Sequence, residues 1–177
     1  MQPLTVFASV FPGEALNPID HDPVEMWVGV PFGEFAIDVS AMVERIDGYV
    51  LILHGAEMVG DDWATPLIEM MEMGASVVSP FIAYGDEAYP PDGSIASYAY
   101  FTHTEVLRRV GGLDTRVLFG HHRLLVNAIH AEGGWVADCD GAVARLTMDP
   151  ARMEALGALY YRQIEDDNTI KALLEAS

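Results

Sequence analysis

Two predominantly apolar runs constrain the fold of this chain more than any other feature of its sequence. Tyr49–Leu53 is apolar at every position, and residues 76–83 are apolar apart from Ser76 and Ser79. A strand with this pattern is buried on both faces, which is typical of the central strands of α/β proteins. We therefore expect an α/β fold in which Tyr49–Leu53 is central in the sheet and is flanked by the strand at 76–83.

The remaining segments alternate between strand and helix patterns. Further strands are expected at 4–10, 24–30, 95–102 and 135–144. Helices are expected at 38–46, 63–73, 103–110 and 121–132, with loops at 54–62 and 85–94. This alternation predicts a largely parallel sheet flanked by helices. Ligands bind at the carboxyl ends of such strands, so the expected site involves residues 11–14, 54–62 and the loops around 111–120.

The C-terminal part reads as a helical extension. Asp149 and Pro150 form a strong helix start, because Asp caps the first turn and Pro suits the first helical position. We expect one helix from 150 to about 164 and a second at 169–176. The expected organisation is an α/β domain at 1–148 and a helical extension at 149–177, packed on the domain or on a partner.

The charge of the chain excludes several classes of partner. Its 177 residues include 27 acidic and 9 basic side chains, which gives a formal net charge of −18. No basic stripe is present to bind nucleic acid or an anionic membrane surface. No apolar stretch approaches the roughly 20 residues of a membrane span. A single cysteine, Cys139, excludes an intrachain disulfide framework and a cysteine-built zinc site.

The N-terminal residues give an expectation about location. They lack the basic region and the small-residue cleavage site of a signal peptide. We therefore expect a cytoplasmic location or incorporation into a virus particle.

Residues 50–71, VLILHGAEMVGDDWATPLIEMM, and residues 103–114, HTEVLRRVGGLD, carry a resemblance to a known family. The chain resembles a family 2 glycosyltransferase of the GT-A fold over about residues 50–146. In that family a buried strand ends in an Asp-x-Asp metal motif, followed by an Asp and a helix. A VGGFDE segment, an acidic helix start, a Gly-aromatic pair and a strand come later. Here Asp62 precedes the helix, VGGLD is the sharpest match, and Gly134-Trp135 follows.

The resemblance implies a nucleotide-sugar donor and a Mg²⁺ or Mn²⁺ ion that neutralises the leaving diphosphate. It also implies a carboxylate that deprotonates the acceptor hydroxyl. The sequence departs from both requirements. The metal motif falls on His54-Gly55-Ala56, with Glu57 displaced by one residue, and the base positions fall on His121 and His122. The late metal-contacting histidine of the family falls on Arg145, and the N-terminal half is short by about one βα unit.

Each candidate residue has a functional and a structural interpretation. His54 and Glu57 are candidate ligands of a rearranged metal site, or polar residues where an ancestral site decayed. His121 and His122 are candidate general bases, or a polar helix start. Asp114 either faces an acceptor hydroxyl or caps the turn after Gly112. The other candidate substrate-binding residues, each with packing or capping as the alternative, are Asp62, Trp63, Gly111, Gly112 and Trp135.

Three functions remain open on this evidence. One is a glycosyltransferase-like domain with lost or reduced metal-dependent transfer, which acts by binding a nucleotide-sugar or a glycan. The second is an active transferase with unorthodox ligands, which would need Mn²⁺ or Mg²⁺. The third is a structural or assembly protein, for example of a phage particle. The short N-terminal half predicts an uncovered apolar surface, and hence a protein partner or a homo-oligomer.

Overall fold

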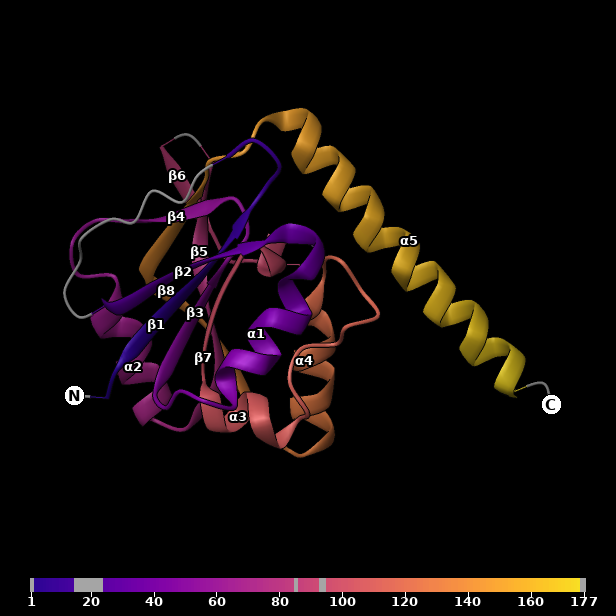
Figure 1. Cartoon of the computed structure of the whole chain (residues 1–177), viewed down its shortest axis with the longest axis horizontal. Coiled ribbons are helices and arrows are strands. Elements are labelled where there is room, and N and C mark those ends of the chain that lie inside the picture. The colour runs from indigo at the N-terminus through magenta and orange to yellow at the C-terminus, as the bar shows by residue number, and fades with distance from the viewer. Residues whose placement is uncertain (1, 15–23, 85, 93–94, 176–177) are drawn as a thin grey trace. The chain divides into compact units, whose positions relative to one another are not determined.

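A mixed eight-stranded sheet with helices on both faces forms the first of two units of the chain (Figure 1). The structure, a computed structural model, describes residues 2–14, 24–84, 86–92 and 95–175. The chain divides into the units Met1–Thr147 and Met148–Ser177. The α/β class expected from the sequence is therefore confirmed, whereas a mainly parallel sheet is not.

The strands are β1 (Leu4–Val10), β2 (Val24–Pro31), β3 (Tyr49–Leu53), β4 (Ala56–Val59), β5 (Ala75–Tyr84), β6 (Glu87–Tyr89), β7 (Ala99–His103) and β8 (Trp135–Leu146). The helices of the first unit are α1 (Phe35–Val43), α2 (Ala64–Glu72), α3 (Thr104–Arg109) and α4 (His121–Ala131), with 3₁₀ turns at Phe32–Glu34 and Ile95–Ser97. The strand order is β2-β1-β3-β7-β5-β8-β4, and β6 pairs with β5.

The position of β7 corrects the expected sheet. We expected Tyr49–Leu53 to be flanked by the strand at 76–83, but β7 lies between β3 and β5 and is antiparallel to both. The pairs β1–β2, β1–β3 and β5–β8 are parallel, while β4–β8 and β5–β6 are antiparallel. The described residues between β5 and β7 form no long crossover helix, which agrees with two strands that run in opposite directions.

The apolar run of β3 is buried on both faces, as its sequence predicts. Its five residues are all buried. Tyr49, Leu51 and Leu53 face a core that α2 covers. Val50 and Ile52 face a second core that α1, α3 and α4 cover (Figure 1). These two cores fix β3 in the interior of the sheet.

Several expected boundaries differ from the observed ones. α1 covers residues 35–43 and not 38–46, because Phe35, Ala36, Val39 and Val43 form its buried stripe. The segments expected as loops at 54–62 and 85–94 contain the short strands β4 and β6. The expected strand at 95–102 is a 3₁₀ turn followed by β7. Short strands that pair at an edge carry little apolar periodicity, so the sequence does not reveal them.

The second unit contains one helix, α5 (Pro150–Glu175), in place of the two expected ones. The residues between the two expected helices, 165–168, include neither Gly nor Pro to break a helix. The end of the expected second helix, residue 176, lies outside the described residues. Within the described part of the chain, no helix combines the length and the apolar character needed to cross a membrane.

Candidate functional site

His54 follows β3 at the carboxyl ends of two parallel strands. β1 and β3 pair in parallel, so Ser9, near the end of β1, and His54 lie at the same edge of the sheet. The Ser9 hydroxyl forms a hydrogen bond with Nδ1 of His54. The backbone N–H of His54 donates to the carbonyl of Tyr98 at 2.8 Å. Backbone and side chain are both anchored at this edge.

Aromatic rings enclose His54. The ring centroid of Phe35 lies 4.3 Å from that of His54, and the centroids of Phe119 and Phe32 lie 5.8 and 6.3 Å away. The side chain of His54 is fully buried. This burial holds the pKa of His54 well below the ordinary value of 6.5, and the neighbouring His121 lowers it further. His54 is therefore a neutral imidazole within an apolar cluster.

His121 begins α4 and lies against the same cluster. Its ring centroid is 5.9 Å from that of His54. Its Nε2 donates a hydrogen bond of 3.0 Å to the carbonyl of Val117, because a carbonyl oxygen can only accept. Nδ1 of the neutral ring is thus an acceptor. Burial lowers the pKa of His121, while the bond to Val117 and the charge of Asp114 act in the opposite direction.

His122 points to a different part of the core. Its Nε2 forms a hydrogen bond of 2.9 Å with the hydroxyl of Ser79 on β5, and its ring contacts Tyr100 on β7. Burial lowers the pKa of His122 to about 4. The two adjacent histidines at the expected base positions therefore have different surroundings.

Glu57 and His54 contact different groups. Glu57 stands on β4 opposite Arg145 on β8, and its carboxylate is 3.7 Å from the guanidinium. Both side chains are half-exposed. The two residues expected as metal ligands thus face an apolar cluster and an arginine, respectively.

The donor set at this place does not suit the ion that the family resemblance implies. Mg²⁺ and Mn²⁺ prefer several oxygen ligands. Ala56 offers no ligand atom, the His54 ring is packed among phenylalanines, and Glu57 faces a cation. Among the described residues, no three His, Cys, Asp or Glu side chains are grouped so as to hold a metal ion.

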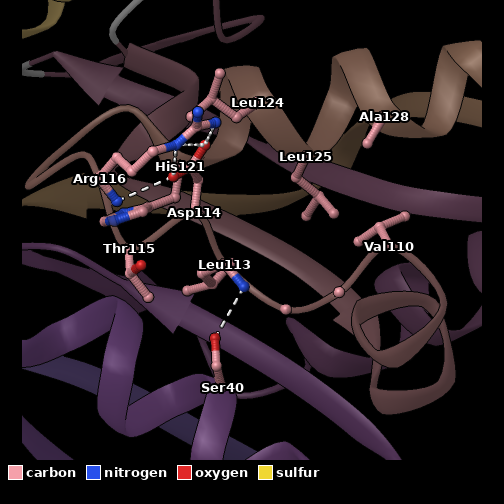
Figure 2. A pocket seen from close by; sticks show the side chains of 12 residues that line it. Ser40, Val110, Leu113, Asp114, Thr115, Arg116, His121, Leu124, Leu125 and Ala128 are labelled. Atoms are coloured by element: carbon pink, nitrogen blue, oxygen red, sulfur yellow. Dashed lines mark hydrogen bonds and ion pairs between the residues drawn. The ribbon is translucent and has the colours of Figure 1, made fainter.

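A pocket of about 400 Å³ lies beside His121 (Figure 2). Residues 110–116 form one wall, α4 forms a second, and Ser40 of α1 lies at the base of the turn. The pocket includes the expected residues Gly111, Gly112, Asp114 and His121. His54, Glu57 and His122 do not line it. Its apolar wall consists of Val110, Leu113, Leu124, Leu125 and Ala128.

The two glycines of VGGLD shape this wall. Gly111 and Gly112 have φ values of +86° and +85°, and their N–H groups donate to the carbonyls of Arg108 and Leu107 at the end of α3. A Cβ on Gly112 would lie 2.6 Å from Oγ of Ser40. That hydroxyl accepts a hydrogen bond of 2.9 Å from the N–H of Leu113.

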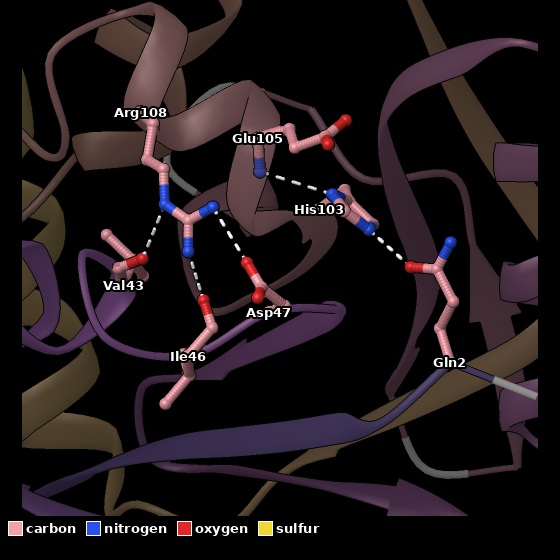
Figure 3. Close-up of polar contacts among 7 residues, drawn as sticks. All are labelled: Gln2, Val43, Ile46, Asp47, His103, Glu105 and Arg108. Atoms are coloured by element: carbon pink, nitrogen blue, oxygen red, sulfur yellow. Dashed lines mark hydrogen bonds and ion pairs between the residues drawn. The ribbon is translucent and has the colours of Figure 1, made fainter.

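Arg108 fixes α3, and with it the start of the turn, against α1 (Figure 3). Its Nε donates to the carbonyl of Val43 at 2.8 Å, and a second nitrogen donates to Asp47 at 2.9 Å. A third bond goes to the carbonyl of Ile46. Residues 110–116, which form the pocket wall, therefore follow directly from α3, a helix that Arg108 holds against the end of α1.

Asp114 presents a charged group to the pocket. Its carboxylate accepts from the backbone N–H of Arg116 at 2.9 Å and from the guanidinium of the same residue at 2.5–3.2 Å (Figure 2). These bonds to Arg116 lower the pKa of Asp114, and His121 contributes in the same direction. Asp114 thus stabilises the turn, as its structural interpretation requires, and also lines the pocket.

The remaining expected residues lie elsewhere. Trp63 is buried in the core that α2 covers, and Asp62 accepts a hydrogen bond of 2.5 Å from the hydroxyl of Thr65 at the start of α2. Trp135 opens β8 and is 44% exposed. None of the three lines the pocket.

Sequence reasoning missed Ser9, Ser40 and Arg116. Ser9 and Ser40 carry no local signal, because their partners His54 and Leu113 are distant in the chain. Arg116 could have been predicted, because an Asp followed two residues later by an Arg is compatible with a turn closed by the Asp side chain.

Comparisons with known proteins do not assign the chain to a family. No protein-family model matches the chain, and no curated protein matches it.

Proposed function

We propose that this chain is a glycosyltransferase-like domain that binds a saccharide and has lost metal-dependent sugar transfer. The observation that carries the proposal is the ionised Asp114, held by Arg116 on the wall of a 400 Å³ pocket. The VGGLD turn and the start of α4 are the saccharide-binding elements.

The pocket combines the groups that recognise a sugar. A carboxylate accepts hydrogen bonds from hydroxyl groups, and a guanidinium donates them. Leu113, Leu124 and Leu125 offer an apolar wall for the C–H face of a pyranose ring. The volume lies within the range of about 300–1,000 Å³ typical of small-molecule sites.

The frame of the resemblance supports the choice of ligand class. A buried strand, the helix α2, the VGGLD turn, the helix α4 and the strand β8 follow one another in the order the resemblance requires. The absence of carboxylates at positions 54 and 56 and the burial of His121 and His122 argue against ordinary metal-dependent transfer. Fold alone does not decide function, so the pocket residues carry the argument.

Calorimetry with and without Mn²⁺ tests the proposal. The probes are a panel of mono- and disaccharides together with common nucleotide-sugars. We expect saccharide binding in EDTA, a loss of at least tenfold in affinity for Asp114→Asn, and no loss for Asp140→Asn, an exposed control on β8. Robust Mn²⁺-dependent hydrolysis of a nucleotide-sugar would contradict the proposal, and Glu57→Ala would then test which residue holds the ion.

We propose further that the chain works beside another protein, either a second copy of itself or a subunit of a larger assembly. Large apolar side chains stand exposed on the first unit, including Met73 at 65% and Trp135 at 44%. Light scattering of the purified chain is expected to give a mass above 19.3 kDa. A monodisperse monomer would contradict the homo-oligomer, and failure to copurify with any protein would contradict the assembly.

A further inference from the structure

His54 and His121 form a buried pair of imidazoles at the inner end of the pocket wall. Their ring planes are inclined by 23° with centroids 5.9 Å apart. The rings of Phe35 and Phe119 pack around them, and Phe119 is fully buried. His121 also lines the pocket, so the pair connects the pocket to the edge of β3.

Each ring leaves one nitrogen without a hydrogen-bond partner among the described residues. These atoms are Nε2 of His54 and Nδ1 of His121, and both are buried. The opposite nitrogens are engaged by the Ser9 hydroxyl and the Val117 carbonyl. Protonation of His121 would therefore add an N–H donor at Nδ1, where no acceptor among the described residues faces it, and protonation of either ring would bury a charge.

We propose that the His54–His121 pair is an acid-sensitive latch that holds residues 113–121 against β3 and releases them when a histidine is protonated. This segment carries Leu113, Asp114 and Arg116 of the pocket wall, so its release dismantles the ligand site. As a control on ligand binding the latch rests on the proposed function, whereas its opening does not depend on any ligand.

Most groups that face the pair are uncharged, whereas the Asp114 carboxylate and the Val117 carbonyl favour a protonated His121 and are outweighed by burial. β1 contributes the Ser9 hydroxyl, and α1 contributes the uncharged ring of Phe35. The segment before α4 contributes Phe119 and the carboxylate of Asp114, which already pairs with Arg116. His121 also stands at the N-terminus of α4, where the helix dipole disfavours a positive charge. His122, the other titratable neighbour, has its own partner in Ser79.

The direction of the effect follows from linkage. Burial lowers the pKa of both histidines in the closed form, whereas a released histidine titrates near its ordinary value of 6.5. The closed form, in which residues 113–121 lie against β3, is thus favoured above pH 6.5, and its population falls as the pH falls. Each histidine raises the opening constant by up to about tenfold per pH unit below 6.5, until it also protonates in the closed form.

Hydrogen exchange followed by mass spectrometry tests the latch on the whole chain without ligand. The opening constant of peptides spanning 113–121, corrected for the intrinsic pH dependence of exchange, is expected to rise at least tenfold between pH 6.5 and 5. Peptides of β3 should keep their protection. In His121→Gln the opening constant should depend less steeply on pH, by a factor of up to about ten per pH unit. His130→Gln, an exposed control on the same helix, should leave the pH dependence unchanged.

Two results would overturn the latch. One is an opening constant of 113–121 that stays constant between pH 6.5 and 5. The other is a full pH dependence in His121→Gln. If that variant does not fold, ring NMR of the wild-type histidines decides, because two ordinary titrations near pH 6.5 in the closed form would exclude the buried pair. Failure of saccharide binding alone would refute the proposed function and leave the latch intact.

Discussion

Gly112 shows how a single residue places the pocket wall. Its left-handed backbone and its contact with Ser40 exclude a side chain for two separate reasons, whereas Gly111 has the same backbone conformation with open space around it. The neighbouring glycines therefore form a matched pair in which backbone strain and steric conflict can be measured separately.

We expect Gly111→Ala to lower the free energy of unfolding by about 1 kcal/mol, the cost of a left-handed alanine. Gly112→Ala should cost about 2 kcal/mol more, because its Cβ would overlap the Ser40 hydroxyl that holds Leu113. Urea unfolding of both variants measures the difference. Equal losses would mean that α1 moves away freely and does not define the pocket.

The candidate residues were predictable to different degrees. The spacing of VGGLD and the helix start at His121 led to four residues that do line the pocket, namely Gly111, Gly112, Asp114 and His121. The sequence did not reveal that His54 is enclosed by Phe32, Phe35 and Phe119, because these contacts join residues far apart in the chain. Burial of a polar residue depends on tertiary neighbours, which local patterns do not encode.

At the scale of elements, one arginine connects α1 and α3. Arg108 donates to the carbonyl of Val43 at the end of α1 and, in the segment that follows, to the carbonyl of Ile46 and to Asp47; its side chain is 29% exposed. Its neighbour Arg109 makes an exposed pair with Glu132 at 2.7 Å. The two adjacent side chains thus have the same chemistry and different burial.

Arg108→Met is expected to reduce the free energy of unfolding by about 2 kcal/mol, because it leaves the carbonyls of Val43 and Ile46 without a donor. Arg109→Met should cost less than about 1 kcal/mol, as is usual for exposed ion pairs. Thermal unfolding of the two variants provides the comparison. An equal effect would show that the connection between α1 and α3 contributes nothing beyond a surface charge pair.

The elements themselves were predicted unevenly. β1, β3 and α4 agree with the expected segments to within one residue, because each has a strong apolar pattern. The direction of β7 and the pairing of β4 and β6 were not predicted. An apolar run shows that a strand is buried, but it does not show which strands lie beside it.

At the scale of the whole molecule, buried histidines make stability depend on pH. His54, His121 and His122 all have lowered pKa values, so each is neutral in the folded protein and takes up a proton on unfolding below pH 6.5. Their contribution to stability is complete above pH 6.5 and declines as the pH falls.

His122 gives the effect a magnitude. Its pKa of about 4 in the folded protein, against about 6.5 when unfolded, corresponds to a loss of about 3 kcal/mol between pH 6.5 and 4. Urea unfolding across this range should show a steeper decline for the wild type than for His122→Gln, which does not titrate. Parallel curves for the two proteins would show that His122 is not held in its neutral form.

Metal-independent saccharide binding in the pocket beside His121 is the property on which the proposed function depends most. Amide NMR spectra of the ¹⁵N-labelled chain, recorded at pH 7 in EDTA during titration with the saccharide that binds best in calorimetry, test this directly. We expect saturable shifts concentrated at residues 110–116 and 121–128, and their loss in Asp114→Asn. Shifts confined to other residues, or binding that appears only when Mn²⁺ is added, would contradict a metal-independent saccharide site in this pocket.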